Sequence, residues 1–159
     1  MTDPNAFHPV FDDDEHTPGF AHRRARTGRQ AGSEHLGASV YELGPGIALC
    51  PYHWHAAEEE ALIVLAGRPS VRSPDGWREL ETGEVVSFLA GADGVHQVAN
   101  WGEEPARVLM LSEFKPIEVC GYPDSDKVMA DAPDPPISHL WRRGDAVDYW
   151  EGEGPPAPP

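Results

Sequence analysis

Three histidines and a glutamate occur at spacings that suit a bound metal ion. His53 and His55 are two residues apart on a predicted strand, so both imidazoles point to the same side of a sheet. Glu60 opens the next predicted strand, and His96 opens a later one. Imidazole and carboxylate ligands suit a divalent first-row ion such as Fe, Mn, Ni or Zn. Four protein ligands would leave coordination positions open for a substrate or dioxygen.

Other polar residues near this set have simpler interpretations. Glu58 and Glu59 compete with Glu60 as ligands, and their place in a turn favours solvated carboxylates. Glu59 and Tyr52 are weak candidates for catalytic acid–base residues, because no dedicated pair stands out. Outside this region, the histidines before residue 37 are expected at the surface: His8, His16, His22 and His35.

Short strands must position these side chains. Apolar runs separated by turn residues predict strands at 40–43, 47–55, 60–66, 71–72, 77–80, 85–89, 96–100 and 107–112. This rhythm is typical of an all-β sandwich or barrel. We therefore expect a barrel over residues 37–118, preceded by a polar N-terminal arm at 1–36. The C-terminal extension, 119–159, is expected to pack on the barrel through Trp141, Tyr149 and Trp150, with a disordered end from residue 152.

The two motifs resemble those of the cupin family. The first reads Gly46, six residues, His53-Trp54-His55, four residues, Glu60, six residues and Gly67. The second reads Gly83, five residues, Leu89-Ala90-Gly91, four residues, His96, three residues and Asn100, with Leu89 where the family usually has proline. The resemblance covers residues 44–112. It implies a double-stranded β-helix, or jelly-roll barrel, in which the two histidines of the first motif, Glu60 and His96 are the metal ligands.

The resemblance leaves several functions open. Cupins of this size include dioxygenases, decarboxylases and isomerases of sugars or keto acids, so a metal-dependent enzyme acting on a small organic substrate is the favoured interpretation. The alternative is a non-enzymatic module that binds or senses a small ligand. The strand at 60–66 is apolar on both faces past Glu60, which predicts a second covering layer and favours a homodimer.

Charge and composition restrict the partners. The chain has 159 residues, 17 prolines, 16 glycines and a formal net charge of −15. Such a charge repels phosphate backbones and anionic lipid headgroups, so neither nucleic acid nor a membrane is expected as a partner. Two cysteines do not make a disulfide framework. With no apolar leader in the first thirty residues, a cytoplasmic protein is expected.

Overall fold

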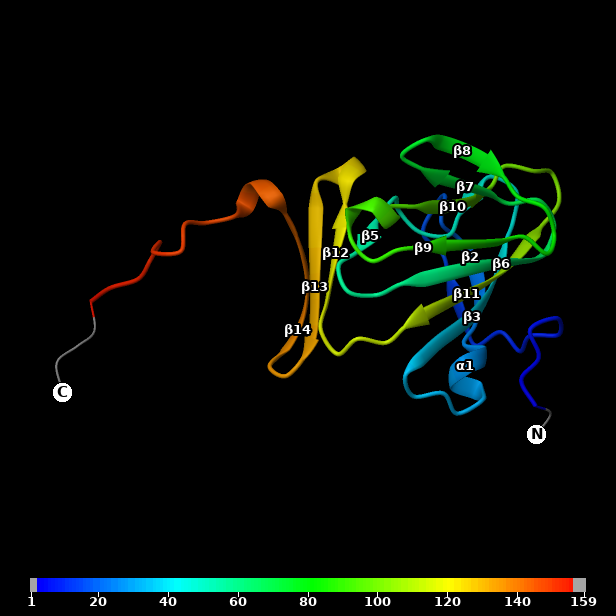
Figure 1. Ribbon diagram of the computed structural model, residues 1–159, viewed down its shortest axis with the longest axis horizontal. Helices are drawn as coiled ribbons and strands as arrows, with labels where there is room; N and C mark the ends of the chain where they lie inside the picture. Colours follow the sequence, from blue (N-terminus) through cyan, green and yellow to red (C-terminus); the bar gives the residue numbers. More distant parts are fainter. Residues whose placement is uncertain (1–2, 156–159) are drawn as a thin grey trace.

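The protein is an all-β barrel with a projecting third sheet, as the computed structural model shows for residues 3–155 (Figure 1). The first sheet has the strand order β1-β2-β3-β11-β6-β9, and the second has the order β4-β10-β7-β8. The bounds of these strands are β1 Asp13–Glu15, β2 His22–Ala25, β3 Leu36–Leu43, β4 Ile47–Ala48, β6 Glu60–Ala66, β7 Ser70–Ser73, β8 Gly76–Glu79, β9 Val85–Phe88, β10 Gln97–Asn100 and β11 Ala106–Glu113.

The third sheet has the order β14-β13-β12-β5. Its strands are β5 Trp54–His55, β12 Glu118–Tyr122, β13 Lys127–Pro133 and β14 Pro136–Arg142. The helices are all short: α1 Thr27–Gln30, and the 3-10 turns η1 Ala92–Gly94, η2 Pro123–Ser125 and η3 Arg143–Asp145. The structure therefore confirms the all-β jelly-roll prediction. Within residues 3–155, no helix is long and apolar enough to cross a membrane.

The core lies between the first two sheets. It follows from strand alternation: Leu62 and Val64 of β6 point inward and are buried, while Ile63 and Leu65 point outward and are only partly covered. The buried cluster comprises Leu43, Leu49, Leu62, Val64, Val71, Leu80, Phe88, Val98, Val108 and Met110. Burial of these side chains provides the main stabilising free energy of the barrel.

Turn chemistry sets where the strands end. Gly67 closes β6 with φ of 77°, a conformation that L side chains rarely adopt. A side chain here would also collide with the neighbouring chain, because its Cβ would lie 2.8 Å from the backbone of Pro105 and of Ala106. Pro51 interrupts the single strand expected at 47–55, which is divided into β4 and β5. The other expected strands appear with ends shifted by a few residues.

The N-terminal segment is more regular than its sequence indicates. Although its composition predicts an arm that is partly ordered at best, β1 pairs with β2, and β2 continues the first sheet along β3. Ala25 is buried opposite Val40, and Thr27 donates a hydrogen bond from its hydroxyl to the carbonyl of Ala38. These contacts join residues far apart in the chain, so local periodicity does not reveal them.

The C-terminal extension meets the barrel at one end and projects from it. β12 pairs with β5, whereas every residue of β14 is exposed. The tail leads away from the barrel on the left of Figure 1. Trp141, Tyr149 and Trp150, expected to pack on the barrel, are exposed by 41%, 81% and 71%. The expected disordered end begins at residue 152, and its last residues, 156–159, lie outside the described part.

Candidate metal centre

Backbone pairing places His53 opposite His96. The amide of His53 donates to the carbonyl of His96 at 3.0 Å, and the amide of His96 donates to the carbonyl of His53 at 2.8 Å. This isolated bridge joins the first motif to the second through adjacent backbone segments. Directly opposite residues in such a pair carry side chains on the same face of the sheet, so both imidazoles point into the same space.

His55 and Glu60 approach the same space from different strands. His55 ends β5, whose two residues pair with Cys120 and Gly121 of β12. Glu60 begins β6 and lies between Phe88 of β9 and Ser112 of β11. The loop between β5 and β6 turns the chain back, so that the carboxylate reaches the imidazoles.

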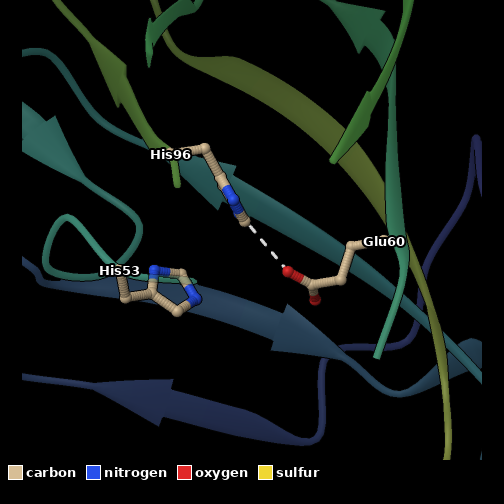
Figure 2. Close-up of side chains that lie close together, drawn as sticks. All are labelled: His53, Glu60 and His96. Carbon is tan, nitrogen blue, oxygen red and sulfur yellow. Dashed lines mark ion pairs between the residues drawn. The ribbon is translucent and has the colours of Figure 1, made fainter. Parts of the chain in front are cut away.

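The donor atoms of the four residues converge. His53 Nε2 lies 3.0 Å from His55 Nε2, and Glu60 Oε2 lies 3.3 Å from Nε2 of His55 and 3.3 Å from Nε2 of His96. Figure 2 shows His53, Glu60 and His96 pointing toward one another. Donor atoms about 2.1 Å from a shared ion are separated by about 3.0 Å at right angles and about 3.4 Å at tetrahedral angles. The observed separations match this geometry.

Hydrogen bonds on the far sides of the rings prepare two imidazoles for a cation. Nδ1 of His53 donates to the carbonyl of Pro51 at 2.9 Å, and Nδ1 of His96 donates to the carbonyl of Gly94 at 2.9 Å. In the neutral ring, a proton on Nδ1 leaves the Nε2 lone pair free to bind a metal. Buried Glu60 Oε2 has no hydrogen-bond partner in the described structure, which also fits a ligand atom.

A second group of potential ligands surrounds the other side of His55. Its Nδ1 lies 3.3 Å from the thiol sulfur of Cys120, and Glu118 is close to both residues. However, Glu118 Oε1 already accepts hydrogen bonds from the backbone amides of Ala56, Ala57 and Val119. We therefore assign this group to holding β5 and the following loop in place.

Two aromatic rings support the other imidazoles: Phe88 stacks on His96, and Tyr122 stacks on His53.

The electrostatics of the centre favour an ion pair between His55 and Glu60. Burial lowers the pKa of His53 to about 4, and the neighbouring imidazoles act in the same direction. Burial alone would lower the pKa of His55, but the hydrogen bond with Cys120 and the ion pair with the Glu60 carboxylate outweigh it, raising the pKa to about 10. Burial opposes ionisation of Glu60, yet His55 and His96 hold its pKa well below the usual range. The centre thus keeps Glu60 as an anion available to a cation.

A cavity of about 350 Å³ opens over the four residues. Side chains from both the barrel and the N-terminal strands line it: Asp13, Asp14, Glu15, His22, Arg24, Tyr41, Leu49, Cys50, His53, His55, Glu60, His96 and Met110. This volume suits a small molecule.

The two weak acid–base candidates lie outside this lining. Glu59 is exposed, and Tyr52 is buried beneath the guanidinium of Arg72, which lies 3.9 Å from its ring centre. Glu58 approaches His55 Nδ1 only to 4.0 Å.

His22 and Tyr41 are cavity residues that the sequence did not indicate. The structure corrects the expectation of a surface position for His22, which is half-buried, with its ring edge-on to Tyr41 at 5.3 Å. Nδ1 of His22 donates to the carbonyl of Phe20 at 2.7 Å, leaving Nε2 unprotonated in the neutral ring. Burial lowers the pKa of His22, which favours this neutral form. The position of His22 follows from the pairing of β2 with β3, which the sequence pattern did not predict.

Comparison with known proteins identifies a cupin domain in the chain. The family model for the cupin domain matches residues 39–112. A solved structure of a proposed sugar phosphate isomerase from Acidithiobacillus ferrooxidans is similar, with 25% identity, a TM-score of 0.76 and 82% of each chain covered. A sugar phosphate isomerase of the cupin superfamily from Silicibacter pomeroyi has 22% identity, a TM-score of 0.74 and the same coverage. No curated protein sequence matches the chain.

Proposed function

This chain is a cupin-domain protein, and we propose that it is a metal-dependent enzyme that isomerises a small hydroxy-carbonyl compound. The observation that carries the proposal is the convergence of Nε2 of His53, Nε2 of His55 and Oε2 of Glu60 at separations of 3.0 and 3.3 Å, with His96 Nε2 also 3.3 Å from Glu60. These four residues would hold one divalent transition ion. A bound ion of this kind supplies a Lewis acid that stabilises negative charge on substrate oxygens.

His22 supports an isomerase over the other cupin reactions. Its Nε2 faces no assigned partner among the described residues, and it belongs to the cavity without being a metal ligand. In an aldose–ketose conversion, His22 takes the proton from the hydroxyl-bearing carbon and returns it to the neighbouring carbonyl carbon. The hydroxyl proton passes to the former carbonyl oxygen, so the reaction needs no oxidant. The similar Acidithiobacillus protein, at 25% identity, is itself a proposed sugar phosphate isomerase.

Metal content is the first test. Elemental analysis of the purified chain is expected to find about one equivalent of Fe, Mn, Ni or Zn, and His53→Ala should lose it. His139→Ala is the matched control, because His139 lies on the exposed strand β14 and should leave the metal content unchanged. Absence of metal from the wild-type chain, even after reconstitution, would contradict the proposal.

Hydrogen exchange separates an enzyme from a binding module. The metal-loaded protein, incubated in D₂O with neutral aldoses and hydroxy-ketones, should introduce deuterium at the carbon next to the carbonyl, as seen by proton NMR. Binding without exchange or turnover would instead favour the non-enzymatic ligand-binding alternative.

We also propose that the protein is a homodimer. The outward side chains of β6 and β11 are only partly covered within one chain: Ala61, Ile63, Leu65, Leu109 and Leu111. An apolar sheet face of this kind is stabilised by a second layer. Light scattering after size-exclusion chromatography is expected to give twice the mass of the chain, and a monomer mass would contradict this.

A further inference from the structure

The N-terminal strand β1 gives the cavity an acidic rim. Asp13, Asp14 and Glu15 all line the cavity, and β1 is held there by its pairing with β2, where Asp13 lies opposite Arg24 and Glu15 opposite His22. Asp14 and Glu15 are exposed to solvent and Asp13 is half-buried. The rim therefore places three carboxylates at the mouth of the cavity that leads to the candidate metal centre.

The nearby arginines are already occupied by carboxylates of the same chain. Arg24, the one Lys or Arg side chain among the described residues that line the cavity, makes an ion pair with Asp13 at 2.5 Å. Arg26 also pairs with Asp13, at 2.6 Å, and reaches Asp12 at 3.3 Å.

Arg23 and Arg107 are engaged in the same way. Arg23 approaches Asp14 at 3.8 Å and Glu42 at 3.6 Å, and Arg107 pairs with Glu42. A phosphate group is usually held by free guanidinium or ammonium groups or by backbone amides. None of these four guanidinium groups is left without a carboxylate partner.

The charge balance turns on β1. Among the residues that line the cavity, a divalent ion and Arg24 together would outweigh the charge of Glu60. The three carboxylates of β1 reverse the sign of this formal charge to negative. A phosphate dianion would meet repulsion from each carboxylate on the way to the centre, whereas an uncharged hydroxyl or carbonyl compound would not.

We propose that β1 makes the site selective for small hydroxy-carbonyl substrates that carry no phosphate group. This inference rests on the proposed function and narrows its substrate class. It also separates this chain from the similar structures described as sugar phosphate isomerases. The cavity volume of about 350 Å³ accommodates a small molecule, so the selectivity is assigned to charge and not to size.

Two probes with one metal-binding group test this selectivity. Acetohydroxamic acid and phosphonoacetohydroxamic acid share the hydroxamate that chelates a metal ion and differ by a phosphonate dianion. Isothermal titration calorimetry with the zinc-loaded chain should show at least about tenfold weaker binding of the phosphonate. Raising the ionic strength should reduce this difference, because Asp14 and Glu15 of the rim are exposed to solvent.

A double variant, Asp14→Asn/Glu15→Gln, removes rim charge with little change of shape. The new amide side chain at position 15 keeps an oxygen that can accept the hydrogen bonds which Glu15 Oε1 receives from the backbone amides of His16 and Thr17. The ratio of the dissociation constants of the phosphonate and of acetohydroxamate should fall by about tenfold. The affinity for acetohydroxamate itself should stay the same. Asp145→Asn/Asp148→Asn changes the net charge equally in the C-terminal segment, and should leave the preference unchanged.

The outcomes distinguish the two proposals. If acetohydroxamate binds but the phosphonate binds equally well or better, or if the rim variant leaves the preference unchanged, the selectivity inference is overturned and the metal centre stands. If neither compound binds the zinc-loaded protein, the proposed metal-dependent function is overturned, and the inference falls with it.

Discussion

The two segments that flank the family-matched barrel, residues 3–35 and 114–155, relate to the candidate site in different ways. The N-terminal segment joins the first sheet through four paired positions between β2 and β3, and it contributes His22 and the acidic rim directly to the cavity. The C-terminal segment touches the barrel through β12, which pairs with the two residues of β5, and through Asp124 of η2, which forms an ion pair with Arg72 of β7 at 2.5 Å. The hairpin of β13 and β14 then projects outward (Figure 1), and β14 is exposed along its length.

The difference separates side chains that line the cavity from side chains that position a potential metal ligand. N-terminal side chains lie in the cavity, where they can change selectivity and proton transfer. C-terminal side chains act from behind the centre, since Cys120 lies next to His55 Nδ1 and Glu118 holds the amides that follow β5. We therefore expect N-terminal changes to affect substrates, and changes in β12 to affect metal binding and stability.

The broadest effect, on both stability and metal binding, is expected from Gly121→Ala in β12. A Cβ at this position would lie 2.3 Å from the ring of Trp54, which immediately precedes His55. Displacing the indole shifts β5 and should reduce the free energy of unfolding by about 1–3 kcal/mol while weakening metal binding. Thermal denaturation and zinc titration would measure both effects.

A matched glycine provides the control for that substitution. At Gly144 a Cβ would meet nothing within 4 Å, so Gly144→Ala should leave both stability and metal affinity close to the wild type. Equal behaviour of the two variants would show that the contact between β12 and β5 does not position His55.

A narrower effect, confined to the reaction, is expected from His22→Gln. Loss of a general base typically slows proton transfer by about 10²–10⁴-fold. Since a base must be unprotonated and burial lowers the pKa of His22 from 6.5, the wild-type rate should rise with pH along a limb centred below 6.5. Hydrogen-exchange rates measured across pH should lose this limb in the variant, with metal content unchanged.

The exposed His35 offers a comparison for His22. His35→Gln should retain the wild-type rate and pH profile, because His35 does not line the cavity. If His22→Gln kept the acid limb, another group would have to be the base.

The smallest effect is expected from a chain ending at Pro133, which lacks β14 and the tail. Because every residue of β14 is exposed, its removal should change the free energy of unfolding by less than about 1 kcal/mol. Elemental analysis should still find the metal. Loss of metal from the shortened chain would show that the projecting hairpin, and not β12 alone, supports β5.

The sequence predicted the strands of the barrel well, because strands and turns are encoded by residues close together in the chain. Alternating apolar residues and turn residues such as Gly67 fix strands and their ends within a few positions. The motif spacing also selected the four side chains that the structure brings together, although their binding of a metal remains a prediction. Glu60 was distinguished from Glu58 and Glu59 by its spacing from Gly67, and it alone of the three lines the cavity.

What the sequence by itself determined was therefore the strand pattern and the set of potential ligands, since both follow from short-range periodicity and spacing. Only the tertiary structure decided that His22 and the carboxylates of β1 line the cavity, and that Trp141 and Trp150 do not pack on the barrel. These positions depend on pairing between distant segments, such as β2 with β3 and β12 with β5. Pairing of this kind is set by backbone hydrogen bonds and burial across the whole fold, which leave no local period in a polar segment.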